Sequence, residues 1–355
     1  MRSEQVSPTE AAAGTSRLIG AVLLGPVRLG EALIAKGTRV DATVAETLGL
    51  AARRGALTRP LRLGWAESGD LHEDEAALRL ARAVAGPGIT IGSPTQSRVN
   101  LAASVDGVLR VRIDALAELN RIDPLEVFTL FHGQAVRAGQ LVGGAKVAPH
   151  LVEAARVEAG EAVARSHPPL VTVAPYLDIE VAAIAVESLT ASALARFENA
   201  ARTKVVSLGG RFAGVTQVAD DDHSEAVGQL VLALNQLTGE RNIRLILVGG
   251  VSAGDPLSPM YEALERVAGQ VLRRGVPAHP GSMIWLGAVG EATLLGLPQC
   301  GMFSMATAAD LVLPRLLTGE RLSADTLADL GHGGLLGQEM RFRFPDYARD
   351  LESPA

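Results

Sequence analysis

The chain has 355 residues, of which 48% are apolar and 20% are charged, and its formal net charge is −6. This length allows two domains with ordinary cores. The negative charge and an aromatic content of 3% argue against a nucleic-acid-binding surface, which needs a basic face and stacking rings. The single cysteine, Cys300, excludes an internal disulfide framework and a cysteine zinc cluster.

The N-terminus predicts neither a signal peptide nor a membrane anchor. Residues 1–16 lack an apolar core, so they predict a disordered tail. The apolar run from Leu18 to Val27 is interrupted by Gly and Pro and is much too short to span a bilayer. We therefore expect a cytoplasmic protein that has no membrane partner.

Residues 17–168 predict an α+β, β-rich region that contains small β modules. Two stretches, one starting at Val27 and one at Val136, share the pattern Val-Arg-x-Gly, followed by Glu or Gln and an apolar run. This echo predicts two similar β-hairpin-like pieces. The pattern leaves open whether the region forms one domain or two.

Helices and a strand pair are expected around these pieces. Arg98 to Leu109 predicts two short strands that turn at Asp106-Gly107. His167-Pro168-Pro169 punctuates the chain, and we place the domain boundary there. Apolar residues at helical spacing predict three helices in this region: Glu73–Val84, Ile113–Asn120 and His150–Ala164.

From Leu170 onward, strand and helix patterns alternate, which predicts an α/β domain over residues 169–319 with a mostly parallel sheet and crossover helices. Residues 320–355 are expected to form a C-terminal extension with one short helix. In open α/β sheets, ligands sit at the carboxyl ends of strands. The predicted strands are Val181–Val186, Phe212–Val218 and Leu245–Val248, and the predicted helices are Ser192–Ser207 and Ser224–Leu237.

The third of these strands is followed by a glycine-rich turn and a helix, within the stretch from Arg244 to Gly275. Ser258 suits the N-cap of the helix, and Pro259 suits its first position. Apolar residues then repeat at helical spacing as far as the predicted stop at Gly275: Met260, Leu264, Val267 and Leu272.

The turn itself has a direct chemical use. Gly249, Gly250 and Gly254 allow positive φ angles and a close approach of a ligand to the backbone. Successive amides in such a turn form a concave anion site. One interpretation is a cradle for a phosphate or another anion, with Asp255 as a carboxylate at its rim. The alternative is a tight strand-to-helix turn in which Asp255 only bonds local amides.

Two further loops follow Gly275. The turn Pro280-Gly281-Ser282 precedes a predicted strand pair, Met283–Gly287 and Thr293–Gly296. The loop from Leu297 to Gly301 follows the pair and leads into a helix that ends near Thr318-Gly319, so its backbone is a second candidate for an anion contact. Within this loop, Cys300 is either a reactive thiol or a small buried residue.

Taken together, three ordered motifs resemble a known family: GGVSAGD from Gly249, PGSMIWLG from Pro280, and GLPQCGMFSMATAADLVLPRLL from Gly296. Their order is similar to the molybdopterin-binding domain of molybdenum-cofactor biosynthesis proteins of the MoaB, MogA and MoeA type. The molybdenum insertase branch carries GGVSxGD, then KPGKP, then GLPGNP, and the nearer match is the branch called MoeA-like molybdopterin-binding protein. The stretches RVNLAASVDGVL from Arg98 and VRAGQLVGGAKVAPH from Val136 also resemble that branch, so the resemblance covers most of residues 20–335 and is strongest from Arg244 to Gly319.

The resemblance implies a three-layer α/β domain that binds molybdopterin through its phosphate and its pterin ring, in a homo-oligomer. It also implies the catalytic candidates Asp255 and Glu187, with Asp255 as a ligand of Mg²⁺. The implied cofactor-binding residues are Gly249, Gly250, Ser252, Gly254 and Asp255 in the first loop, Pro280, Gly281 and Ser282 in the second, and Pro298 and Cys300 in the third.

The sequence also departs from the insertase pattern. The two lysines of the insertase's second loop are replaced by Ala278 or His279 and by Ser282. The insertase motif TGDEL corresponds to residues 186–190, where Glu187 supplies the comparable carboxylate. Losing two cations from an anion site weakens both binding and transition-state stabilisation.

These observations lead to three hypotheses for function. The first is a molybdopterin-binding protein in molybdenum-cofactor biosynthesis or handling, with a transferase activity of the molybdopterin molybdotransferase type if it is an enzyme. The second is a non-catalytic carrier or assembly factor that delivers the cofactor to an apo-molybdoenzyme. The third is a protein that binds another phosphorylated small molecule at the same loops.

Overall fold

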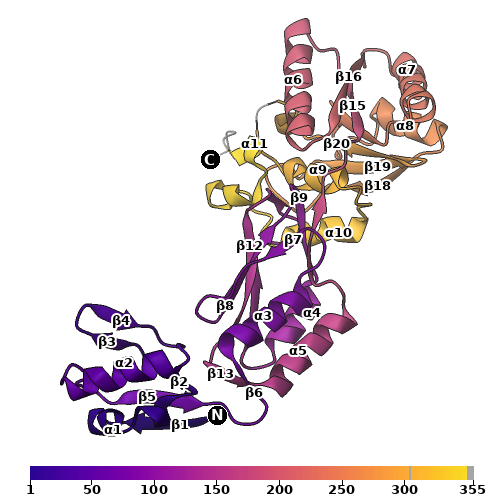
Figure 1. Cartoon of the computed structure of the whole chain (residues 1–355). Coiled ribbons are helices and arrows are strands. Elements are labelled where there is room, and N and C mark those ends of the chain that lie inside the picture. The colour runs from indigo at the N-terminus through magenta and orange to yellow at the C-terminus, as the bar shows by residue number, and fades with distance from the viewer. Residues whose placement is uncertain (304, 350–355) are drawn as a thin grey trace. The chain divides into compact units, whose positions relative to one another are not determined.

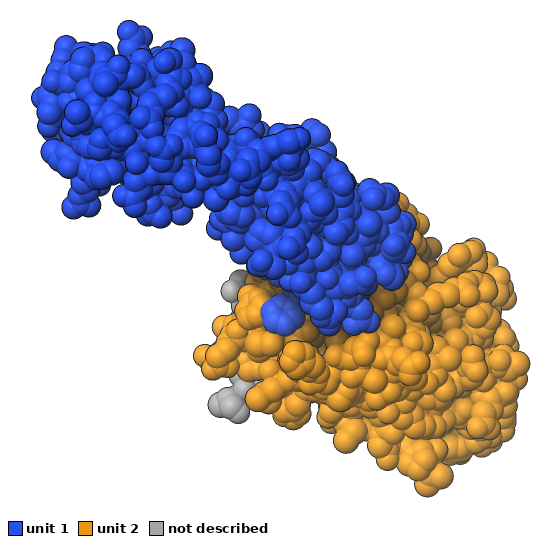
Figure 2. Space-filling model, turned by 90° about the horizontal axis from the view of Figure 1, so that it is seen from below, with its two compact units in different colours: residues 1–105, 109–132, 137–173 blue, residues 106–108, 133–136, 174–355 orange. Residues whose placement is uncertain are grey.

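The computed structural model describes residues 1–303 and 305–349 (Figure 1). The chain divides into two compact units, which are coloured separately in Figure 2. Unit 1 contains residues 1–105, 109–132 and 137–173, and unit 2 contains residues 106–108, 133–136 and 174–355. No helix in the described ranges is long and apolar enough to cross a membrane.

Unit 1 begins with a small lobe of residues 1–65 that has its own apolar cluster. A three-stranded antiparallel sheet has the order β1-β5-β2, and α1 packs on α2. The hairpin β3–β4 confirms the first of the two predicted β pieces. The elements of the lobe are β1 (Arg2–Val6), α1 (Pro8–Ala13), β2 (Ala21–Leu23), β3 (Val27–Leu29), β4 (Ala32–Ile34), α2 (Ala42–Arg53) and β5 (Leu61–Trp65), with a 3₁₀ turn at Thr15–Leu18.

The prediction of a disordered N-terminal tail is wrong. Residues 2–6 pair with β5, and the side chains of Val6 and Ala11 are fully buried. Ser7 and Glu10 form a capping box that starts α1, because each side chain accepts a bond from the other residue's backbone N–H. The stretch therefore orders by strand pairing and a capped helix rather than through a long apolar run.

The rest of unit 1 packs three helices with a four-stranded antiparallel sheet of order β10-β12-β8-β7. The helices α3 and α4 have the predicted bounds. The helix α5 starts four residues later than predicted, because Leu151–Glu153 first pair as a strand with β6. The elements are β6 (Asp70–His72), α3 (Glu73–Val84), β7 (Ile89–Ile91), β8 (Arg98–Ala103), α4 (Ile113–Asn120), β10 (Leu125–Thr129), β12 (Leu141–Val147), β13 (Leu151–Glu153) and α5 (Ala154–Ser166).

Two predicted β pairings in this region are wrong. The strands β8 and β9 (Gly107–Val111) do not form a hairpin, because β8 pairs with β12 and β7, whereas β9 lies in a separate sheet of order β11-β9-β14. The echo at Val136 is not a hairpin either: it contributes β11 (Ala135–Val136) to the sheet of β9 and β12 to the four-stranded sheet. The last strand of the three is β14 (Val171–Pro175).

Unit 2 is built on a six-stranded mixed sheet of order β16-β15-β17-β20-β19-β18. The strands β16, β15, β17 and β20 are parallel neighbours, and β19 and β18 extend the sheet antiparallel. The strands are β15 (Glu180–Val186), β16 (Arg211–Val218), β17 (Leu245–Gly249), β18 (Gln270–Arg274), β19 (Trp285–Val289) and β20 (Ala292–Gly296), and the helices between them are α6 (Ala191–Ser207), α7 (His223–Asn235) and α8 (Pro259–Arg266).

The parallel part of the sheet is thus limited to four strands, and across the described chain most strand pairings are antiparallel. Each predicted strand and helix from residue 181 to residue 237 is present with bounds shifted by one or two residues. The predicted strand pair is β19 and β20, which are joined by a tight turn at Gly290 with a φ of +54°. A two-residue connection of this kind joins antiparallel neighbours only.

Alternate residues of the central strands face two different apolar clusters. In β15, Ala183 and Ala185 belong to the cluster that includes α6, whereas Ile184 and Val186 belong to the cluster that includes α7 and α8. In Figure 1, α6 and the pair α7 and α8 accordingly lie on opposite sides of β15 and β16. Both faces of the sheet are therefore covered, which fixes the strand ends that carry the loops.

The helix predicted as far as Gly275 ends at Arg266. Ala268 has a φ of +56°, and a Cβ on Gly269 would lie 2.8 Å from Cγ2 of Val289. The chain therefore turns back against β19 at this point, and Leu272, one of the four periodic residues, lies in the strand β18.

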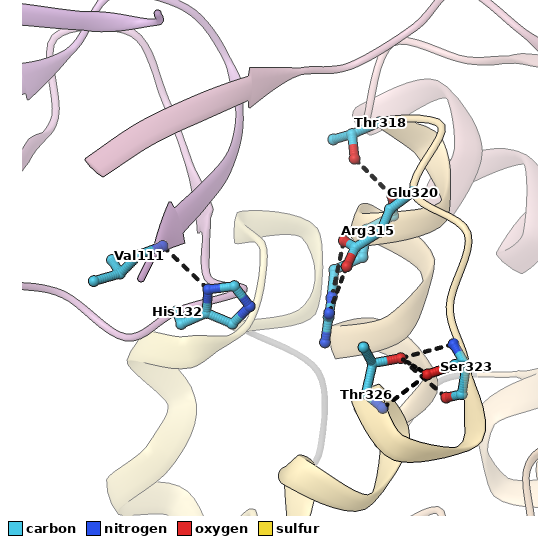
Figure 3. Close-up of polar contacts among 7 residues, drawn as sticks. All are labelled: Val111, His132, Arg315, Thr318, Glu320, Ser323 and Thr326. Atoms are coloured by element: carbon cyan, nitrogen blue, oxygen red, sulfur yellow. Dashed lines mark hydrogen bonds and ion pairs between the residues drawn. The ribbon is translucent and has the colours of Figure 1, made fainter. Parts of the chain in front are cut away.

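The segment after β20 returns to the apolar cluster on the α6 side. Arg315 and Glu320 form a mostly buried bidentate pair, with Nε–Oε2 and Nη2–Oε1 distances of 3.0 and 2.6 Å, and Ser323 and Thr326 form a capping box (Figure 3). Phe344 is fully buried in the cluster. The elements are the 3₁₀ turn η3 (Gln299–Met302), α9 (Ala309–Leu317), α10 (Ala324–Ala328), 3₁₀ turns at Asp329–Gly331 and Gln338–Arg343, and α11 (Asp346–Arg349).

Candidate functional site

A pocket of about 600 Å³ lies in unit 2, where five segments of the chain meet. Four of them follow the strands β15, β16, β17 and β20, and the fifth precedes β19. Most of the site residues predicted from the sequence line this pocket. The lining residues are Glu187, Asp220, Gly250, Val251, Ser252, His279, Pro280, Gly281, Ser282, Met283, Leu297, Pro298, Gln299 and Cys300.

The parallel strands explain why these loops meet. Ile184 of β15 is in register with Val248 of β17, and Val248 is in register with Gly296 of β20. The three strands thus end side by side at one edge of the sheet, where open α/β sheets bind ligands. The N–H of Leu297 donates to the carbonyl of Val248 at 2.7 Å, so the pairing continues one residue into the loop.

Gly250 makes the sharpest close approach in the first loop. Its φ is +79°, and a Cβ at this position would lie 2.5 Å from the carbonyl oxygen of Val186. Its N–H donates to the sulfur of Met302 at 3.2 Å. A Cβ on the neighbouring Gly249 would lie 2.6 Å from Cε of the same methionine. Gly250 is therefore required by the close approach of the backbone of β15, whereas a side chain at position 249 would have to displace the end of the Met302 side chain.

The rest of the first loop is held by local bonds. The N–H of Gly254 donates to Oγ of Ser252 at 3.2 Å, and the N–H of Leu257 donates to Oδ1 of Asp255 at 3.0 Å. Asp255 is exposed, and Gly249, Gly254 and Asp255 lie outside the lining of the pocket. The structure therefore shows the carboxylate of Asp255 in the local amide bond that the alternative interpretation describes, and its role as a catalytic or metal-binding residue stays a prediction.

Two aromatic side chains support the first loop from the side of the sheet. The indole N–H of Trp285 donates to the carbonyl of Val251, and the hydroxyl of Tyr261 donates to the carbonyl of Ser252, each at 3.1 Å. The two rings pack edge to face with centroids 5.4 Å apart. Burial raises the pKa of Tyr261 above its ordinary value of 10.0. The shift therefore extends to higher pH the range in which the hydroxyl can donate this bond.

The second loop is pressed against the start of α9. Gly281 has a φ of +104°, and a Cβ there would lie 2.7 Å from the backbone nitrogen of Ala308. The N–H of Ala308 donates to the carbonyl of Pro280 at 2.9 Å. Because Gly281 has no Cβ, the second loop can approach the backbone of Ala308 this closely. This contact positions Pro280 and Ser282 at the pocket.

The third loop, which follows β20, turns tightly after Pro298. The N–H groups of Gly301 and Met302 donate to the carbonyl of Pro298 at 2.8 and 3.1 Å, which forms η3. Cys300 lies on this turn, is partly exposed and lines the pocket. The thiol is thus not the fully buried residue of the second interpretation, and its reactivity stays a prediction.

The charge of the pocket differs from that expected of an anion site. Its described lining contains the carboxylates of Glu187 and Asp220 and the imidazole of His279, and it contains no Lys or Arg. Gln217 holds the loop of Glu187 by donating to the carbonyls of Glu187 and Leu189 at 3.0 and 3.1 Å. Within residues 1–303 and 305–349, no three His, Cys, Asp or Glu side chains are grouped as a preformed metal site.

Asp220 is one of the lining residues that sequence reasoning did not assign to the site. It follows β16, which is parallel to β15, so its position after a strand end was the available signal. Sequence reasoning also did not assign Gln299 and Met283. Their position in the lining depends on how the loop after β20 and the loop before β19 bend toward each other.

Comparisons with known proteins find similar solved structures, whereas no protein-family model and no curated protein matches the chain. The chain is similar to the molybdopterin biosynthesis enzyme MoaB from Thermus thermophilus, with 17% identity over 40% of this chain and 98% of that chain, and a TM-score of 0.29. A molybdopterin biosynthesis protein from Mycobacterium abscessus is 15% identical over 40% of this chain and 96% of that chain, with a TM-score of 0.29. The molybdopterin biosynthesis MoeA protein from Pyrococcus horikoshii is 17% identical over 70% of this chain and 74% of that chain, with a TM-score of 0.28. Values this low assign neither a family nor an activity to the chain.

Proposed function

We propose that the pocket of unit 2 binds molybdopterin and that the protein acts in the biosynthesis or handling of the molybdenum cofactor. The observation that carries this proposal is the meeting of three separate motifs, GGVSAGD, PGS and LPQCG, in one pocket of about 600 Å³. These are the motifs whose order resembles the molybdopterin-binding family. The volume lies within the range of about 300–1,000 Å³ that is usual for small-molecule sites.

The lining offers a ligand two kinds of contact. Ser252, Ser282 and Gln299 supply polar groups that suit the many donors and acceptors of a pterin ring. The carboxylates of Glu187 and Asp220 repel a phosphate unless a divalent cation lies between them, and Mg²⁺ prefers oxygen ligands from carboxylates and phosphates. We therefore expect molybdopterin to bind with Mg²⁺, which Glu187 and Asp220 would hold.

The absence of Lys and Arg from the described lining favours a second candidate, a carrier that binds the cofactor without transforming it. Cationic side chains stabilise the charge that develops on a transferring phosphate or on molybdate. Without them, the pocket can retain a ligand that is bound through a metal ion and neutral groups, but its power to accelerate a transfer is reduced. In this case the partner would be an apo-molybdoenzyme that receives the cofactor.

Binding can be tested with the chain's single cysteine as a reporter. Cys300 lines the pocket, so bound molybdopterin should slow its alkylation by iodoacetamide in an anaerobic titration. We expect protection that saturates and that requires Mg²⁺. Gly250→Asp should abolish it, because the new side chain meets the end of β15 and adds a third carboxylate. Gly228→Ala is the control, since Gly228 lies in α7 outside the motif and the lining, its new Cβ meets no atom within 4 Å beyond the adjoining residues and the helix's own backbone, and the variant should be protected like the wild type.

The outcomes separate the three hypotheses. Molybdenum insertion or release of nucleotide from a nucleotide–molybdopterin adduct, measured with molybdate and Mg²⁺, would identify an enzyme. Protection without turnover, together with transfer of the cofactor to an apo-molybdoenzyme, would identify a carrier. Protection of Cys300 by a nucleotide but not by molybdopterin would contradict the proposal and indicate another phosphorylated ligand.

A further inference from the structure

A second hollow, of about 560 Å³, lies in the N-terminal lobe of unit 1, far along the chain from the pocket of unit 2. One wall is the hairpin β3–β4 with the residues before it, and the other is the segment between α2 and β5. The lining residues are Pro26, Val27, Arg28, Gly30, Leu33, Ala56, Leu57, Thr58, Arg59, Pro60 and Leu61.

The two walls are fixed to the same core. Val27 of the first wall and Leu57 and Leu61 of the second are buried members of the apolar cluster of the lobe. Gly30 turns the hairpin with a φ of +64°, and Pro60 restricts the backbone just before β5. Both walls are thus anchored in the apolar core of the lobe, and such anchoring lowers the entropic cost of ordering them around a ligand.

The charged side chains of the hollow are of one sign. Arg28 and Arg59 line opposite walls, and no carboxylate belongs to the lining that the structure describes. Among the residues that the structure describes, neither guanidinium has a hydrogen bond or an ion pair, although the same protein pairs Arg79, Arg202 and Arg315 with carboxylates. An anion held in the hollow would supply the charged partner that both guanidinium groups lack among the described residues.

The surrounding sequence has the same polarity. Residues 24–62 contain seven Lys and Arg residues and three Asp and Glu residues, whereas the whole chain has a net charge of −6. This segment is therefore positively charged, whereas the whole protein is negatively charged. A positive segment attracts anions and so raises their local concentration near the hollow.

We propose that this hollow binds a small phosphate monoester, with Arg28 and Arg59 holding the phosphate and Thr58 donating a hydroxyl hydrogen. A guanidinium matches two phosphate oxygens at once, and the volume leaves room for an organic group beyond the phosphate. The hollow is concave, and among the described residues no aromatic ring lines it. Those two features favour a small ligand over a nucleic acid, which needs an open basic face and stacking side chains.

The test uses the full chain and measures binding of inorganic phosphate and of glycerol 3-phosphate by calorimetry. We expect the monoester to bind more tightly than phosphate, and we expect Arg28→Gln and Arg59→Gln each to weaken binding by about 10-fold or more, since each removes a charge-assisted contact. The control is Arg54→Gln, because Arg54 is exposed in the same segment but outside the lining, and it should change affinity by less than about 2-fold.

Three results would overturn the proposal: equal weakening by all three substitutions, no binding of either phosphate at millimolar concentration, or tighter binding of a single-stranded oligonucleotide that displaces the monoester. Unfolding in urea checks that the variants fold, and their midpoints should match the wild type because both arginines are exposed. The proposal stands independently of molybdopterin binding, which Cys300 reports in the other unit.

Discussion

Lys204 and Asp310 form an ion pair inside unit 2, with only 3% and 0% of their side chains exposed. Lys204 comes from α6 and Asp310 from the first turn of α9. The carboxylate also accepts bonds from the hydroxyl of Tyr347 at 2.9 Å and from the N–H of Thr307 at 2.8 Å. The pair therefore holds the start of α9, which is the backbone that Gly281 of the pocket contacts.

Replacing Lys204 by Met should destabilise unit 2 strongly. The substitution keeps most of the volume but leaves a buried carboxylate without its cation, which costs about 3–5 kcal/mol. Urea unfolding of the full chain measures the change. Arg202→Met is the control on the same helix, because Arg202 makes an exposed pair with Glu198 that should contribute less than about 1 kcal/mol. The double variant Lys204→Met with Asp310→Asn should recover part of the loss, and equal effects of the single variant and the control would refute the assignment.

Gly250→Ala should disturb both stability and the pocket. The φ of +79° costs a residue with a Cβ about 1–2 kcal/mol, and the overlap with the carbonyl of Val186 adds to this. We expect a loss of about 2 kcal/mol or more and a changed alkylation rate at Cys300. In Gly254→Ala, the nearest atom beyond the adjoining residues lies 3.6 Å from the new Cβ, so the effect on unfolding should stay within about 0.5 kcal/mol. A harmless Gly250→Ala would mean that the loop can move away from β15.

Tyr261→Phe should loosen the first loop without unfolding the unit. It removes the bond to the carbonyl of Ser252, which is worth about 1 kcal/mol. Hydrogen exchange at the amides of residues 250–255 should become faster. Trp285→Phe should have a larger effect, since a Cβ on Gly296 would lie 1.9 Å from Nε1 of the indole, so the ring fills space that no smaller side chain would fill. Trp65→Phe in unit 1 is the control, and it should leave the exchange of the amides of residues 250–255 unchanged. Faster exchange of these amides in the control would indicate a global effect.

The pair of Arg79 and Glu161 should make unit 1 sensitive to acid. Arg79 donates from Nε and Nη2 to the two carboxylate oxygens at 2.8 and 2.9 Å, and these bonds lower the pKa of Glu161 below its ordinary value of 4.5. Because the folded pKa is depressed, the stabilisation is present above the ordinary pKa of 4.5 and is lost as the pH falls through the folded pKa.

Glu161→Gln should therefore be less stable than the wild type at about pH 7, by an amount on the order of 1 kcal/mol, and the difference should shrink toward about pH 3. Urea midpoints measured across this range of pH check the expectation. Glu158→Gln is the control from the same helix, because Glu158 is exposed and acts on Arg79 through a Coulomb attraction. A difference that stays constant with pH would show that the effect comes from packing and not from the charge.

Local patterns predicted the helices and strands better than the pairing between them. Glu73–Val84 has acidic residues in its first turn and an apolar face at helical spacing, and it forms α3 with those bounds. The two strands around Asp106-Gly107 were also recognised, but their partners lie elsewhere in the chain. Partner choice depends on which apolar faces meet in the folded unit, and the sequence between two neighbouring strands does not contain this information.

The candidate site shows the same division. The glycine loops and their order could be predicted from the sequence. In the structure, Gly250 and Gly281 have the positive φ angles that glycine permits. The side chains that pack behind these loops could not be predicted. The sulfur of Met302 accepts a bond from the N–H of Gly250, and the ring of Trp285 leaves no room for a side chain at position 296. Each of these contacts depends on how separate elements are arranged in the fold, and a periodic sequence pattern does not predict a single tertiary contact.

The division of the chain into units has a consequence for synthesis on the ribosome. Residues 106–108 and 133–136 belong to unit 2 but are translated within the part of the chain that makes unit 1. Unit 1 has all its residues once position 173 has left the ribosome, whereas these two pieces must wait for the residues that follow. Neither unit is one uninterrupted stretch, so a gene cut near residue 168 would separate unit 2 from its two early pieces.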